Sequence, residues 1–250
     1  MQDLPIRLNK DPIVEAVFEI RFEGTTDSIA NLLPGRSYPD LGEEFPKIEA
    51  LPQAHFPKEV HQLDPVLRYR ATHRLVGDGF VILLGNKVFG LACVGPYVGW
   101  AHFRARIVRV VELLQKTKLF KSVERFSLKY INVLTAQDEL PDLQLLDFPL
   151  SLGTHDLTAT TTRLRTEISL DGFLNILQVI PGTRALSPSG QHVRGLLFDI
   201  DTISEQPFKD FWAELPQLLD AAHQTEKRLF FTTLTKAALE RFEPVWEEKQ

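Results

Sequence analysis

One alternating stretch occurs twice in this chain, and it constrains the fold more than any other feature. Residues 123–134 read VERFSLKYINVL, and residues 13–22 read IVEAVFEIRF. Each stretch alternates side chains between two faces, the period-two pattern of a strand that buries one face. Because the signal recurs in each half of the chain, we expect an internal duplication.

The elements expected around these two strands also follow one order. In the first half a helix follows residue 26, three strands cover 67–75, 80–84 and 88–94, and an amphipathic helix covers 100–116. In the second half a helical turn near 141–146 precedes strands over 157–170, 174–180 and 195–200 and a helix from 208, with a last short helix near 235–242. The same turn, Asp78-Gly79-Phe80 and Asp171-Gly172-Phe173, joins two strands in each half.

The sequence therefore predicts an α+β fold. We expect two βαβββα-type repeats, residues 1–120 and 121–250, that form one pseudo-symmetric unit. They would share a continuous, mostly antiparallel, curved sheet with the long helices on one face. Residues 34–65 hold six of the 16 prolines, which predicts an irregular surface insertion in the first repeat.

Charge provides a test of this pairing. The strand at 13–22 carries Glu15 and Glu19 on its polar face, and the strand at 123–134 carries Arg125 and Lys129 at the equivalent positions. Antiparallel pairing of the two strands would place Glu19 opposite Arg125 and Glu15 opposite Lys129. Such a structural charge ladder is worth a few tenths to about 1 kcal/mol per pair.

Composition narrows the class of protein. The 250 residues, 44% hydrophobic and 24% charged, suffice for a sizeable core without cross-links. A net charge of −5 gives no overall attraction to nucleic acid or anionic lipid. The single cysteine, Cys93, excludes an internal disulfide and a cysteine-based zinc site. No apolar run is long enough to span a bilayer and no leader is evident, so we expect a cytoplasmic protein with no membrane partner.

No catalytic set, metal site or cofactor motif is expected. The seven histidines lack the i, i+4 spacing of a helical metal site, and no phosphate-binding loop, dinucleotide fingerprint or nucleophile elbow is present. Asp199 and Asp201 share one face of a strand, but two carboxylates without a third ligand more often belong to a solvated strand end. Cys93 lies within an apolar strand and is expected to be a small buried hydrophobe.

Two groups of residues are candidates for binding. Arg68, Arg70 and Arg74 are expected on one face of a strand, and Arg163 and Arg165 on the equivalent strand of the second half. Together they would line an open sheet face able to bind phosphates or single-stranded nucleic acid, although exposed strands commonly carry arginine and nearby glutamates dilute the field. The second group, Tyr97 and Trp100, flanks a helix start and would cap a pocket or anchor the core.

A resemblance is carried by residues 12–22, by the Tyr97-Val98-Gly99-Trp100 turn and by the strand from Glu124 to Asn132. These segments resemble a sporadically distributed family of uncharacterised bacterial proteins, over nearly the whole chain. The resemblance implies no activity, cofactor or catalytic residue. The element order is also similar to the duplicated saddle of TATA-box-binding proteins, a likeness of topology alone.

Three functions are compatible with these features. We favour a non-enzymatic interaction protein whose open sheet face or long loop binds another protein, such as a toxin or defence enzyme encoded beside it. The second is a nucleic-acid or phosphate binder that uses the arginines. The third is a small-ligand receptor or enzyme with a pocket between sheet and helices, which would require a cavity with converging polar side chains.

Overall fold

The computed structural model describes residues 4–135, 142–158, 162–186, 192–204 and 207–247. Its main strands are β2 (Ile13–Gly24), β3 (Lys47–Ala50), β4 (His73–Val76), β5 (Phe80–Leu84), β6 (Val88–Val94), β7 (Phe120–Leu134), β10 (Leu164–Leu170), β11 (Phe173–Leu186) and β12 (His192–Ser204). Within the described ranges they form one 9-stranded sheet in the order β10-β11-β12-β7-β2-β6-β5-β4-β3. Each pair of neighbours is antiparallel.

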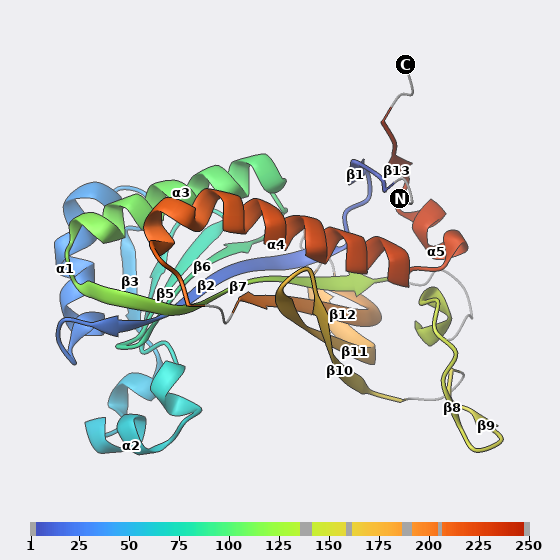
Figure 1. Cartoon of the computed structure of the whole chain (residues 1–250), viewed down its shortest axis with the longest axis horizontal. Coiled ribbons are helices and arrows are strands. Elements are labelled where there is room, and N and C mark those ends of the chain that lie inside the picture. Colours follow the sequence, from blue (N-terminus) through green and yellow to red (C-terminus); the bar gives the residue numbers. More distant parts are fainter. Residues whose placement is uncertain (1–3, 136–141, 159–161, 187–191, 205–206, 248–250) are drawn as a thin grey trace.

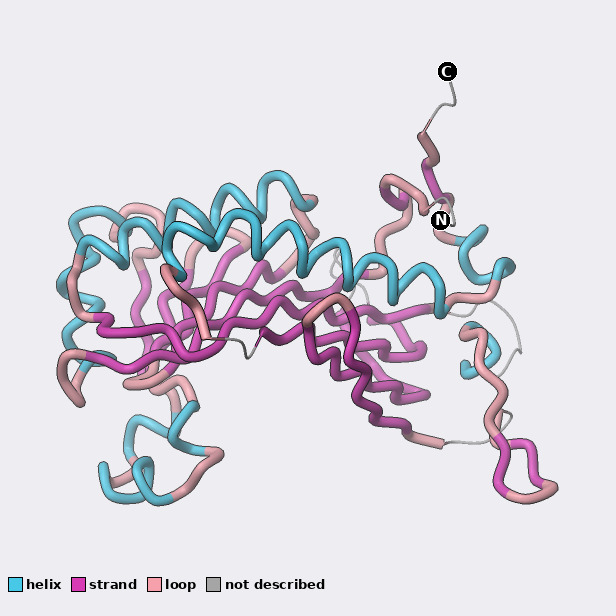
Figure 2. The backbone as a smooth tube through the Cα atoms, in the orientation of Figure 1, coloured by secondary structure: helices cyan, strands magenta, loops and turns pink. Residues whose placement is uncertain are grey.

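The helices complete an α+β fold. They are α1 (Ile29–Leu41), α2 (Lys58–Leu63), α3 (Trp100–Lys116), α4 (Phe211–Thr233) and α5 (Lys236–Arg241). Helices α3 and α4 lie side by side across one face of the sheet, and α2 lies beyond the opposite face (Figure 1). Figure 2 shows that the long helices leave this opposite face of the central strands uncovered. No helix in the described ranges is long and apolar enough to cross a bilayer.

Side-chain alternation explains how the sheet and helices join. On β2 every second side chain is fully buried beneath the helices, namely Ala16, Phe18, Ile20 and Phe22. On α3 the buried positions recur at helical spacing, namely Phe103, Ile107, Val110, Val111 and Leu114. Burying one such large side chain stabilises the fold by about 1.5–3 kcal/mol, so this shared core holds sheet and helices together. The predicted strand and helix periods are confirmed here.

Strands β2 and β7 pair at the centre of the sheet, as predicted, but the predicted register is wrong. Glu19 faces Ser127 rather than Arg125, and Glu15 faces Ile131 rather than Lys129. A displacement of two residues leaves every side chain on its own face, so the period-two pattern could not select between the two registers. Glu19 reaches Arg125 diagonally instead, with Oε1 and Nη2 3.6 Å apart.

The prediction for residues 34–65 is also wrong in large part. Helix α1 continues through Pro34 and Pro39, strand β3 pairs with β4, and α2 follows. Each proline removes a backbone donor, but α1 buries one face against the core. This packing outweighs the local preference that the prolines express.

Strand boundaries differ from the predictions where the chain leaves the sheet. Residues 67–69 form a 3₁₀ turn, and β4 begins only at His73. Strand β10 begins at Leu164 rather than 157. Strands β11 and β12 extend into the loop expected over 181–192, of which residues 187–191 lie outside the described residues.

Candidate functional site

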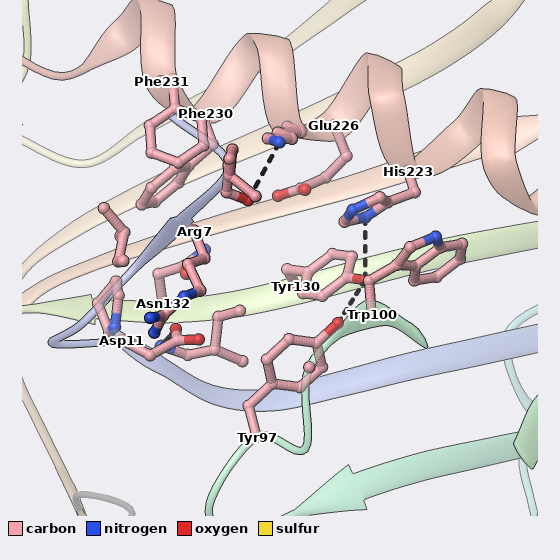
Figure 3. Close-up of a pocket in the computed structure, with 16 residues that line it drawn as sticks. Arg7, Asp11, Tyr97, Trp100, Tyr130, Asn132, His223, Glu226, Phe230 and Phe231 are labelled. Carbon is pink, nitrogen blue, oxygen red and sulfur yellow. Dashed lines mark hydrogen bonds between the residues drawn. The ribbon is translucent and has the colours of Figure 1, made fainter. Parts of the chain in front are cut away.

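A pocket of about 140 Å³ lies beside the C-terminal half of α4, where this helix passes the first turn of α3 (Figure 3). Strand β7 and the start of β2 form its floor, and the chain that precedes β2 closes its side. The lining residues are Ile6, Arg7, Leu8, Asp11, Pro12, Ile13, Tyr97, Gly99, Trp100, Tyr130, Asn132, His223, Glu226, Lys227, Phe230 and Phe231.

The N-terminal wall of the pocket is fixed by the C-terminal end of the chain. Strand β1 (Arg7–Leu8) pairs with β13 (Pro244–Val245), and the Ile6 amide donates to the Val245 carbonyl at 2.7 Å. Further along, the Asp11 carboxylate accepts from the Ile13 amide at 3.0 Å. Residues far apart in sequence therefore converge on the pocket.

The turn before α3 supplies two aromatic walls. Gly99 adopts φ +82, a conformation that disfavours other residues, and it places Tyr97 before the helix and Trp100 in its first turn. The Trp100 ring stacks on His223 of α4, with centroids 4.1 Å apart. The structure thus brings Tyr97 and Trp100, both singled out from the sequence, to one cavity.

Three polar groups form a chain along the pocket. The hydroxyls of Tyr97 and Tyr130 lie 3.1 Å apart, and the Tyr130 hydroxyl lies 3.3 Å from Nδ1 of His223 (Figure 3). Burial raises the pKa of both tyrosines and lowers the pKa of His223 to about 4. All three groups are therefore neutral near pH 7, and they order the wall without carrying charge.

Glu226 is a buried acidic residue in the lining of the pocket. Its side chain extends from α4 toward the floor, beside the Tyr130 ring (Figure 3). It is 5% exposed, and among the described residues its carboxyl group has no hydrogen-bond or ion-pair partner. Burial, and secondarily the charge of Asp11, raise the pKa of Glu226 to about 8. A buried carboxyl without a partner is energetically costly, so such groups are candidates for function.

The cations of the lining are already engaged with the protein. The Lys227 ammonium donates to the Ile6 carbonyl at 3.2 Å, and the exposed Arg7 donates from Nη1 to the Asn9 side chain at 2.9 Å. Burial lowers the pKa of Lys227, an effect that Glu226 opposes. Neither cation forms an ion pair with the Glu226 carboxyl group.

The five candidate arginines are not assembled into one site. Arg68 and Arg70 lie in and just after a 3₁₀ turn rather than on a strand, which corrects the prediction. Arg74 is on β4, and Arg165 is on β10, seven strand spacings away, or about 33 Å along the sheet. Arg163 is exposed just before β10. The strand predicted to carry Arg68 and Arg70 is absent from the sheet because the chain between β3 and β4 folds as a separate arm over the open face.

Most of these arginines are neutralised locally. Arg68 approaches Glu23 at 3.4 Å, Arg74 pairs with Glu49, and Arg165 pairs with Glu167 at 2.8 Å. The helix-free face therefore carries a balanced mixture of charges rather than a basic field.

The two strand aspartates that suggested a cation site have a protein partner. The Lys129 ammonium lies 2.8 Å from Asp199, and its charge also acts on Asp201. Burial raises the pKa of both carboxyls, and Lys129 opposes the effect. In the described part of the chain no group of three or more histidine, cysteine or acidic side chains is arranged to hold a metal ion. Cys93 is buried in β6.

Sequence reasoning missed His223 and Glu226. Glu226 lies seven residues after Leu219 and four before Phe230, on the buried stripe of α4. A charged residue on an apolar stripe is a signal that the sequence contained. Asp11 could not have been found in this way, because it precedes β2 in a loop and lies on no apolar stripe.

No family model and no curated protein matches the chain.

Proposed function

We propose that this protein binds a small ligand in the pocket between the sheet and α3 and α4. The supporting observation is the convergence of Glu226, Asp11 and the Tyr97–Tyr130–His223 chain on one cavity of about 140 Å³. This volume is close to that of an engineered cavity of about 150 Å³ that binds benzene. The ligand, or the part of it that enters, is thus of benzene size.

Binding is better supported than catalysis. The two tyrosines and His223 are all neutral at pH 7, and neither phenol has a lowered pKa that would make it a base or a nucleophile. The aromatic rings and apolar side chains provide contact area, and a few polar groups provide orientation. This combination is typical of ligand sites.

A fragment screen by ligand-observed NMR tests this proposal. Benzene-sized fragments should bind the wild-type protein. Ile6→Trp should abolish binding because the larger side chain would fill the pocket that Ile6 lines. The fold should tolerate this change because Ile6 is half exposed. Leu152→Trp is the matched control, since Leu152 is exposed on the distant β8 strand (Ser151–Leu152) and should leave binding unchanged. Equal binding by Ile6→Trp, or no binding by the wild type, would reject the proposal.

A second function, binding of another protein, is supported by the arm between β3 and β4. Large apolar side chains are exposed along it, namely Phe56, Val60, Leu63 and Val66, with Leu63 82% exposed. Exposed apolar clusters often mark interaction sites. A protein that binds a toxin or defence enzyme would need an exposed surface of this kind. Leu63→Asp should release a partner that the wild type and Leu152→Asp both retain.

Nucleic-acid binding has less support, since acidic residues pair with Arg68, Arg74 and Arg165.

We also propose that the two halves of the chain are copies of one unit around a pseudo-two-fold axis. From the centre of the sheet outward, the first half contributes β2-β6-β5-β4 and the second β7-β12-β11-β10, in the same chain order. Gly79 and Gly172 occupy equivalent turns, and both have positive φ. Superposition of residues 13–116 on 123–233 tests this idea, and strands that align only out of order would reject it.

A further inference from the structure

We propose that the pocket selects a primary amine in its ammonium form and that Glu226 binds the charged nitrogen. This inference specifies the ligand class and therefore rests on the proposed small-ligand function. It follows from what the pocket lacks and from what its walls offer.

What the pocket lacks is a donor for Glu226. The carboxyl group is buried, points into the cavity and has no hydrogen-bond or ion-pair partner among the described residues. Its oxygens keep accessible surface toward the cavity, so a ligand in the pocket can reach them. An ammonium supplies N–H donors together with the opposite charge, the pairing that stabilises a buried carboxylate most.

The walls suit the rest of such a ligand. Phe230, Phe231 and Tyr130 present aromatic rings around the cavity. Aromatic faces attract cations by about 0.5–2 kcal/mol and pack well against apolar groups. The hydroxyls of Tyr97 and Tyr130 also belong to residues of the lining and can accept hydrogen bonds.

An anionic ligand fits less well. It would lie against two carboxyl groups, Glu226 and Asp11, while the Lys227 ammonium is held by the Ile6 carbonyl. Arg7 is exposed at the edge and bonded to Asn9. The free amides at the start of α3 are thus the main attraction for an anion, and Tyr97 and Trp100 flank them.

Amine binding should be linked to proton release. Near pH 7 the Glu226 carboxyl is mostly protonated, and the groups around it are Asp11, Lys227 and the neutral Tyr97, Tyr130 and His223. When an ammonium binds, the carboxyl loses its proton to the buffer and becomes the counter-ion. Close to one proton per amine should therefore be released at pH 7.

Three probes of one size separate the possibilities, namely benzylamine, benzyl alcohol and benzoate. Calorimetric titrations at pH 7, in two buffers of different ionisation enthalpy, measure affinity and proton release together. We expect benzylamine to bind at least about tenfold more tightly than benzyl alcohol, because one hydrogen bond to a charged group strengthens binding by about this factor. Benzoate should bind most weakly.

Two variants complete the test. Glu226→Gln keeps the size of the side chain but cannot ionise, so benzylamine should lose about tenfold in affinity and all proton release, whereas benzyl alcohol should bind as before. Glu240→Gln makes the same change at an exposed site on α5 and should behave as the wild type. Thermal melts of both variants check that they are folded.

The outcomes are distinct. Tighter binding of benzyl alcohol or benzoate, sensitive to Ile6→Trp, would overturn the amine inference and retain the ligand site. Benzylamine binding that is unchanged in Glu226→Gln or releases no proton would also overturn it. If none of the three probes binds, both the inference and the proposed function fail.

Discussion

The pH dependence of stability offers a test of Glu226 that needs no ligand. Its pKa is raised from 4.5 to about 8 in the folded protein, so between these values the folded state binds more protons than the unfolded state. Stability must then fall as pH rises through this window, by about 1.4 kcal/mol per pH unit. At pH 7 the accumulated loss from this one group is about 3 kcal/mol.

His223 acts in the opposite direction over part of that window. Its pKa is lowered from 6.5 to about 4, so the unfolded state binds the extra proton and stability falls as pH drops below 6.5. Between about pH 4.5 and 6.5 the two contributions cancel. The combined contribution of the two groups should therefore be nearly flat there and decline by about 1.3 kcal/mol from pH 6.5 to 8.

Glu226→Gln isolates the carboxyl term. The difference in unfolding free energy between variant and wild type should increase by about 1.4 kcal/mol per pH unit from pH 5 to 7.5, because all other groups contribute equally to both proteins. Urea unfolding at several pH values, followed by tryptophan fluorescence, measures it. Glu240→Gln should run parallel to the wild type. A difference that does not change with pH would refute the buried, unpartnered state of Glu226.

Three further predictions concern the frame around the pocket, and urea unfolding at pH 7 measures each. Lys129→Met should cost about 3 kcal/mol because it leaves the buried Asp199 without its counter-ion. Arg165→Met removes one partner of an exposed pair and should change stability by about 0.5 kcal/mol or less. Equal effects of the two substitutions would contradict the burial of the Lys129–Asp199 pair. Phe126→Ala should cost about 3–5 kcal/mol, since Phe126 is fully buried at the centre of the sheet, and a loss below 1 kcal/mol would mean a loosely packed core. Asp220→Ala should cost about 1 kcal/mol or less, because the bidentate pair that joins α4 to α3 is partly exposed, and a much larger loss would show that it acts as a buried pair.

The central sheet could be predicted because its signals are local and consistent. Alternation on β2 and β7 and the helical stripe of α3 each identify a buried face. The register could not be predicted, since a shift of two residues changes neither face. Glu19 therefore meets Arg125 only diagonally.

The first-half insertion could not be predicted for a different reason. The helix-breaking tendency of Pro34 and Pro39 is a local preference, and in α1 it is outweighed by the burial of Ile29, Leu33 and Leu41. The same limit applies to Arg68 and Arg70, whose alternation with apolar residues resembles a strand but belongs to an arm outside the sheet. Local pattern cannot reveal packing that depends on distant chain segments.

The position of the pocket follows from the unequal lengths of the two long helices. They run antiparallel, as the contacts of Trp100 with His223 and of Arg104 with Asp220 require. Helix α4 has 23 residues and α3 has 17, so α4 continues past the start of α3 from His223 onward. Helix α3 therefore does not reach this overhang, and the segment that carries β1 covers it on the side of the pocket. Glu226 is on the first turn of the overhang. The pairing of β1 with β13, together with the backbone bonds from Asn9 to Glu243 and from Lys10 to Phe242, thus holds this segment over the site.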